Sequence, residues 1–171
     1  MISYDESEGE LREIFEPLQY EPGKIDHIIQ IHSLLPSTMT SHHTYYRDIM
    51  FGRSSLSRKE RELVATVVSI LNECHYWTKH HGEALRRLSR RDDIVNELKE
   101  KETPEFLTER EKSIVRYAVK LTRTPAEMEK KDVETLRKNG LDDESILNLV
   151  LVTGYFAFVN RLADGLGIDI E

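Results

Sequence analysis

The chain has 171 residues, of which 24 are lysine or arginine and 31 are aspartate or glutamate, so its formal net charge is −7. This negative charge argues against nucleic acid or an anionic membrane surface as the main partner, because both favour basic patches. The length is that of one domain, and we expect residues 1–171 to form a single one.

Cysteine usage and hydropathy indicate a protein of a reducing compartment. The single cysteine, Cys74, excludes an intrachain disulfide. The first 16 residues are acidic and carry no apolar run typical of a secretion signal. No stretch reaches the roughly 18 apolar residues of a membrane span. We therefore expect a cytoplasmic protein with no membrane partner.

Apolar residues recur with helical spacing along the chain, and no segment alternates with the spacing of a strand. This pattern predicts an all-α protein of about eight helices. They are expected near residues 7–16, 24–34, 38–51, 58–71, 75–90, 91–101 and 109–122, with a C-terminal pair from 125. The most apolar segment, 146–166, contains polar and charged residues such as Asn148 and Asp164, and is predicted to be a buried helix.

Capping motifs locate several helix ends. Three stretches have the capping-box pattern, a Ser or Thr followed three residues later by Glu, and they begin at Ser57, Thr108 and Thr124. The last of these has a proline at the first helical position, where proline is favoured. Gly52 and Gly140 are expected to end the helices before them. Asp142 is expected to cap the final long helix.

The stretch from Asn72 to Gly82 is chemically dense, because it holds the only cysteine, the only tryptophan and three of the seven histidines. On a helix, Cys74, Trp77 and His81 share one face. A thiol near a helix start has its pKa lowered by the exposed N–H groups, and the thiolate is the nucleophile. The stretch therefore predicts a reactive thiol, provided that a bend brings a glutamate of the preceding helix to the same face.

Simpler interpretations compete at each position. A lone buried cysteine is usually a small hydrophobic residue, and Trp77 on the same face is more often part of a core. His80 and His81 are more often hydrogen-bonded polar residues than metal ligands. The spacing of Cys74 and the histidines matches no zinc pattern well, so we expect neither a metal nor a cofactor. His42 and His43 form a second pair, for which the sequence indicates no chemistry.

The segments Leu56–Leu63 and Asn72–Gly82 together resemble the active-site helix pair of the alkyl hydroperoxidase D / carboxymuconolactone decarboxylase family. The likeness is closest to the family's peroxidase-related branch. The segment Phe156–Gly167 resembles the same branch, as does the opening with Tyr4-Asp5-Glu6 and Gly9-Glu10-Leu11-Arg12. The resemblance implies a helical bundle of the alkyl hydroperoxidase D type that assembles into homo-oligomers, commonly trimers or hexamers.

The family motif is a glutamate, then about a dozen residues later Cys-x-x-Cys, then three residues and a histidine. On this resemblance the proton-relay glutamate maps to Glu62, the first cysteine to Cys74 and the histidine to His81. The second cysteine, which is taken to attack the peroxide, maps to Trp77. A dithiol mechanism needs two thiols within reach, so this departure impairs it. Tyr76, Trp77 and His80 are expected to line the pocket.

Three functions follow from the resemblance and stay open at this point. The first is a peroxidase-related antioxidant oxidoreductase that reduces alkyl hydroperoxides through Cys74, with Glu62 and His81 transferring protons and an external thiol as reductant. The second is a carboxymuconolactone decarboxylase-like enzyme that uses Glu62 and His81 for acid–base chemistry on a small lactone acid. The third is a degenerate member that binds a small ligand or assembles without catalysis.

Overall fold

The computed structural model describes residues 1–168, so positions 169–171 of the expected domain lie outside the described residues. Within residues 1–168 the chain is all-α, as predicted, with nine α-helices and no strand. The helices are α1 (Gly9–Phe15), α2 (His27–Gln30), α3 (Pro36–Phe51), α4 (Arg58–Leu71), α5 (His75–Ser89), α6 (Ile94–Glu100), α7 (Glu109–Arg123), α8 (Lys130–Lys138) and α9 (Asp143–Leu166). Short 3₁₀ turns cover Glu16–Leu18, Ile31–Leu34 and Pro125–Glu127.

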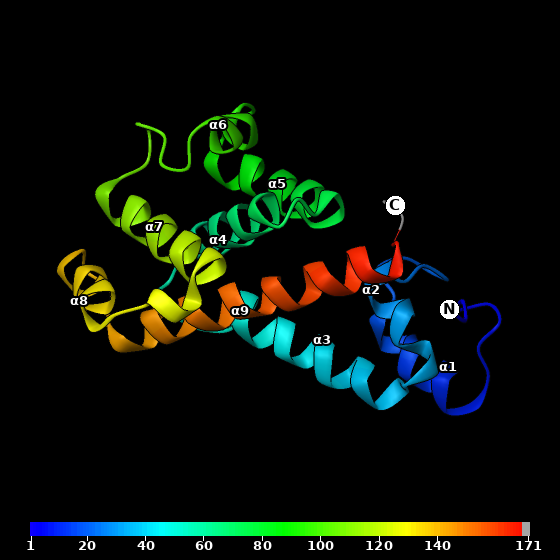
Figure 1. Cartoon of the computed structure of the whole chain (residues 1–171). Coiled ribbons are helices and arrows are strands. Elements are labelled where there is room, and N and C mark those ends of the chain that lie inside the picture. The colour runs from blue at the N-terminus through cyan, green and yellow to red at the C-terminus, as the bar shows by residue number, and fades with distance from the viewer. Residues whose placement is uncertain (169–171) are drawn as a thin grey trace.

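Helix α9 runs through the middle of the molecule, with α3 crossing it on one side and α4 to α7 on the other (Figure 1). By length and composition alone this helix is apolar enough to cross a membrane, since its most apolar window has a mean hydropathy of 1.5. However, 56% of that window is buried inside the protein. We interpret α9 as the core helix that the sequence predicts.

Helix α4 is buried around almost its whole circumference, because it separates two apolar cores. Val64, Ala65 and Val68 belong to the larger core, which they share with residues of α3 and α9. Leu63 and Val67 belong to the smaller core, which they share with residues of α5, α6 and α7. Different faces of α4 therefore pack against different groups of helices.

The first two predicted capping boxes are present. The Ser57 hydroxyl accepts from the backbone N–H of Glu60 at 3.3 Å, and the Glu60 carboxylate accepts from the backbone N–H of Ser57 at 2.7 Å. Thr108 and Glu111 form the same pair of bonds at 3.2 and 2.9 Å. Helices α4 and α7 therefore begin where the sequence places them.

The third predicted box is wrong, and the C-terminal helix pair begins at residue 130 rather than 125. Residues Pro125–Glu127 form only a 3₁₀ turn, because Met128 leaves the helical region (φ −64°, ψ 135°) and packs against the larger core. Glu129 then forms the actual capping box with Asp132, whose carboxylate accepts from the backbone N–H of Glu129 at 2.8 Å. A competing cap five residues further on thus determines the start of α8.

The corrected cap assignment predicts unequal effects of three threonine or serine substitutions. We expect Ser57→Ala and Thr108→Ala each to lower the free energy of unfolding by about 1 kcal/mol, because each removes a hydrogen bond to an otherwise unpaired helix N–H. Thr124→Ala serves as the matched control and should change it by much less. Urea denaturation at neutral pH measures all three, and an effect of Thr124→Ala as large as that of Ser57→Ala would contradict the assignment.

Candidate active site

The candidate site is built on the hairpin of α4 and α5. Helix α4 ends at Leu71, and Glu73 adopts a left-handed conformation (φ 57°) before Cys74 caps α5 in extended geometry. The Asn72 side-chain amide donates to the side-chain oxygen of Asn160 on α9 at 2.8 Å, which ties this turn to the core helix. The tight turn folds α5 back along α4. It is the bend that the mapped motif requires.

The hairpin brings Glu62 of α4 and His81 of α5 into direct contact. His81 Nδ1 lies 2.5 Å from Glu62 Oε2, and the other carboxylate oxygen accepts from Arg58, with Arg58 Nε at 2.7 Å. Glu62 has no exposed surface and His81 is 4% exposed. The structure therefore joins two of the three residues that the motif singles out, and adds Arg58 as a second partner of Glu62.

The protonation of this pair follows from its contacts. Burial by itself would raise the pKa of Glu62, but the hydrogen bond and charge of His81, with those of Arg58, outweigh burial and hold that pKa below its ordinary value. Glu62 is thus an ionised carboxylate, which only accepts hydrogen bonds. His81 must therefore donate from Nδ1, which leaves the Nε2 lone pair available in the neutral ring.

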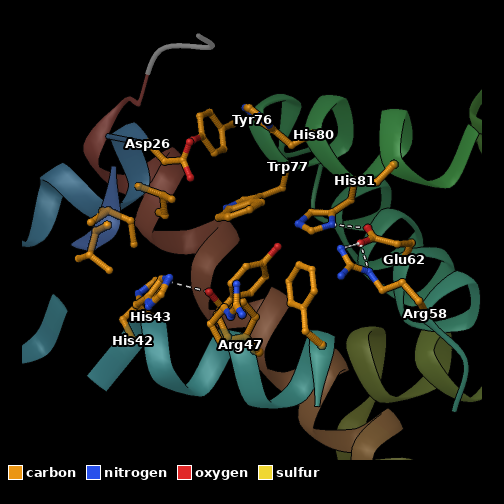
Figure 2. A pocket seen from close by; sticks show the side chains of 17 residues that line it. Asp26, His42, His43, Arg47, Arg58, Glu62, Tyr76, Trp77, His80 and His81 are labelled. Carbon is orange, nitrogen blue, oxygen red and sulfur yellow. Dashed lines mark hydrogen bonds and ion pairs between the residues drawn. The ribbon is translucent and has the colours of Figure 1, made fainter. Parts of the chain in front are cut away.

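His81 Nε2 is a buried nitrogen with no hydrogen-bond partner in the part of the chain that the structure describes. Figure 2 shows the imidazole with one nitrogen toward Glu62 and the other toward the cavity. Trp77 stacks on the ring with centroids 5.2 Å apart and planes at 24°, and Phe156 meets it edge-on at 4.5 Å. The indole of Trp77 donates to the carbonyl of Val159 at 3.1 Å. These contacts hold the imidazole in one orientation.

The cavity has a volume of about 290 Å³, at the small end of the range for ligand pockets. One wall comes from α5 and contains the three residues expected to line the pocket together with the relay histidine, namely Tyr76, Trp77, His80 and His81. The opposite wall comes mainly from α3 and α9, and contains His42, His43, Tyr46, Arg47, Phe51 and Tyr155. Figure 2 shows these two groups of side chains facing each other.

Cys74 does not line this cavity. Its side chain is completely buried in the larger core. Burial, opposed by the N–H groups at the start of α5 and helped by the nearby Asp164 carboxylate, raises the pKa of the thiol to about 11. The expectation of a lowered thiol pKa is therefore wrong, because loss of solvation outweighs the helix start. The thiol is protonated near neutral pH.

Sequence reasoning missed the α3 wall and the partner of Glu62. Arg58 lies four residues before Glu62 on one helix, a spacing that favours an ion pair and could have been recognised. His42, Tyr46 and Arg47 belong to a segment with no motif of its own. Their role depends on how α3 packs across α9, and only the folded chain shows that arrangement. No group of three potential metal ligands is present among residues 1–168.

The family model and the similar solved structures point to the same protein family. The carboxymuconolactone decarboxylase family model matches residues 39–120. An uncharacterized peroxidase-related protein from Silicibacter sp. TM1040 is 32% identical with a TM-score of 0.84, over 95% of this chain and 85% of that one. A second, an alkylhydroperoxidase AhpD-core protein from Ralstonia eutropha JMP134, is 21% identical with a TM-score of 0.86, over 100% of this chain and 93% of that one.

The same fold is present in the debrominase Bmp8, which is 18% identical with a TM-score of 0.77, over 94% of this chain and 86% of that one. No curated protein matches the sequence.

The surroundings of Cys74 predict an unreactive thiol. We expect 5,5′-dithiobis(2-nitrobenzoate) to label the folded protein slowly at pH 7.5 and to label it rapidly in 6 M guanidinium chloride, because only unfolding exposes and ionises the thiol. Absorbance at the thionitrobenzoate band follows the reaction, and Cys74→Ser gives the blank. Rapid stoichiometric labelling of the folded protein would contradict the buried, protonated thiol.

Proposed function

The chain belongs to the alkyl hydroperoxidase D / carboxymuconolactone decarboxylase family, and from that premise we propose that it is an acid–base enzyme acting on a small organic acid. The observation that carries the proposal is the Glu62–His81 pair in the cavity wall, in which His81 Nε2 has no hydrogen-bond partner among residues 1–168. In this proposal His81 removes a proton from the substrate, and Glu62 stabilises the imidazolium that forms. Arg58 keeps Glu62 ionised.

The opposite wall supports an anionic substrate. Arg47 lines the cavity, is exposed and has no ion-pair partner among residues 1–168. Its guanidinium lies 5.2 Å from the centre of the Phe51 ring, which limits its freedom. A guanidinium of this kind suits a carboxylate, which it can bind through two parallel hydrogen bonds. Arg58 is already committed to Glu62.

The shape and composition of the walls support a flat, unsaturated substrate. The rings of Trp77 and Tyr46 line the cavity on its two sides, and the volume of about 290 Å³ limits the ligand to a small molecule. Aromatic rings favour stacking against planar groups. A small lactone carrying a carboxylate, the substrate class of the decarboxylase side of the family, meets both requirements.

Thiol-dependent reduction of alkyl hydroperoxides, the first expectation from the sequence, has weaker support. A peroxide-reducing cysteine needs to be accessible and to have a lowered pKa. Cys74 is buried outside the cavity lining, and burial raises its pKa to about 11. Trp77 occupies the position of the family's second cysteine and instead stacks on His81. The geometry therefore favours the acid–base alternative.

The proposal predicts proton exchange that depends on His81 and not on Cys74. The probes are unsaturated five-membered lactones that carry a carboxylate, incubated with the protein in D₂O. We expect proton NMR to show loss of the signal of the C–H next to the lactone carbonyl. His81→Gln should slow this exchange by about 10²-fold or more, as is typical for loss of a general base. Cys74→Ser should leave the rate unchanged.

Two further measurements distinguish the alternatives. Nitrogen-15 NMR of His81 should show the tautomer that is protonated at Nδ1 and unprotonated at Nε2. Consumption of tert-butyl hydroperoxide with dithiothreitol, abolished by Cys74→Ser, would contradict the proposal in favour of the thiol mechanism. Absence of lactone exchange together with absence of peroxide consumption would also contradict it, in favour of a non-catalytic member of the family.

A further inference from the structure

A chain of hydrogen bonds leads from the cavity to the protein surface on the side opposite His81. The Tyr155 hydroxyl lies 2.6 Å from His42 Nε2, His42 Nδ1 lies 2.9 Å from His32 Nε2, and His32 Nδ1 lies 2.7 Å from Thr38 Oγ1. Tyr155 and His42 are buried and line the cavity, whereas Thr38 is exposed. Figure 2 marks the innermost bond, at His42, with a dashed line.

The chemistry of imidazole restricts this chain to two arrangements. A neutral imidazole has one donor and one acceptor nitrogen. Because both ring nitrogens of His42 and of His32 have partners, all the bonds must run in the same direction. In the first arrangement, Tyr155 donates to His42, in the direction of the surface, and Thr38 donates its proton to the carbonyl of Leu35, which lies 2.7 Å away.

In the second arrangement every bond is reversed. Thr38 donates to His32, His32 donates to His42, and His42 donates to the oxygen of Tyr155. The Tyr155 proton is then directed away from His42. Thr38 Oγ1 lies 2.7 Å from both the Leu35 carbonyl oxygen and His32 Nδ1, so rotation of one exposed hydroxyl is enough to change its partner.

The surroundings keep the members of the chain uncharged. Burial lowers the pKa of His42 to about 4, and the neighbouring charges of His32 and His43 add to that effect. Burial also lowers the pKa of His32. Burial raises the pKa of Tyr155, so that the phenol keeps its proton at neutral pH. Both imidazoles are thus neutral, as the two arrangements require.

We propose that Tyr155 is a second catalytic residue of this site, acting as an acid opposite His81, and that His42 and His32 resupply its proton from solvent at Thr38. The inference rests on the proposed acid–base function. The ring of Tyr46 lies near both groups, with its centroid 6.4 Å from that of His81 and 5.7 Å from that of Tyr155. A flat substrate placed against Tyr46 therefore meets both groups.

The proton balance of the step is complete. His81 Nε2 takes a proton from a carbon of the substrate, and Tyr155 gives its hydroxyl proton to another substrate atom. At the same time, the Tyr155 oxygen takes the proton from His42 Nε2. The proton on His32 Nε2 then moves to His42 Nδ1, and the hydroxyl proton of Thr38 moves to His32 Nδ1. Solvent returns a proton to Thr38, and His81 releases one to solvent when the product leaves. The substrate class is thereby isomerised, with no oxidant or reductant required.

The test uses the same carboxylated lactones in wild-type and variant proteins. Tyr155→Phe removes the acid, and His42→Gln keeps a hydrogen bond to Tyr155 but cannot pass a proton along. We expect each change to slow isomerisation by about 10²-fold, while the nitrogen-15 shifts of His81 stay at their wild-type values. His42→Gly should regain activity when imidazole is added. His75→Gln, at an exposed histidine outside the cavity, is the control and should behave as wild type.

The outcomes separate the relay from the function on which it rests. Wild-type turnover with undiminished rates in Tyr155→Phe and His42→Gln would overturn the relay alone. Loss of activity in His42→Gly without rescue by imidazole would assign His42 a structural role and also overturn the relay. If the wild-type protein turns over none of the lactones, the proposed function fails. Nitrogen-15 NMR of His42 then tests whether the hydrogen-bond chain changes direction.

Nitrogen-15 NMR gives that independent measurement at pH 7. Exchange between the two arrangements predicts that both ring nitrogens of His42 have shifts intermediate between protonated and unprotonated values. Thr38→Val removes the hydroxyl that changes partner, and should move the two shifts apart toward one fixed tautomer. A wild-type protein in which His42 already has a single fixed tautomer would overturn the relay.

Discussion

The pairing of the buried Glu62 carboxylate is the constraint on which the site depends. An ionised carboxylate without exposed surface is tolerated only when its charge is matched and its oxygens accept hydrogen bonds. Arg58 satisfies one oxygen from the same helix, and His81 satisfies the other from the next helix. The charge therefore links the packing of α4 against α5 to the orientation of His81. Because the carboxylate can only accept, it also determines which nitrogen of His81 faces the cavity.

Trp77 explains how the family's cysteine motif is altered while the hairpin that carries it is retained. A thiol at this position would leave a gap beside the imidazole, whereas the indole fills it, stacks on His81 and donates to the Val159 carbonyl. The remaining cysteine packs as a small apolar residue. Its place at the start of α5 would normally favour the thiolate, but complete burial and the nearby Asp164 have the larger effect. The altered site therefore has an aromatic surface and an available imidazole where the family has a pair of thiols.

The two walls of the cavity have complementary chemical properties. The α5 wall contains His81, whose imidazole is hydrogen-bonded to the buried Glu62 carboxylate. The wall from α3 and α9 presents a guanidinium at Arg47, which has no ion-pair partner among residues 1–168, and a phenol at Tyr155 that is hydrogen-bonded to His42. Small shifts in the packing of α3 against α9 would separate the phenol from its partners, so the polar chain and the apolar crossing of these helices depend on each other. A ligand between the walls would meet a base on one side, and a cation and an acid on the other.

Most of the fold was predictable from local signals, because helix periodicity and caps act over a few residues. Ser57 and Thr108 begin α4 and α7 as their motifs indicate, Asp142 caps α9, and Gly140 follows α8. Thr124 carries the same pattern but does not begin a helix, because the packing of Met128 and the cap at Glu129 compete with it. The motif also singled out Glu62 and His81, which the hairpin of α4 and α5 brings into contact, while their catalytic role stays a prediction. The burial of Cys74, the direction of its pKa and the contribution of His42, Arg47 and Tyr155 were decided only by the tertiary structure. Solvation and contacts between distant helices control those properties, and neither is encoded in the spacing of nearby residues.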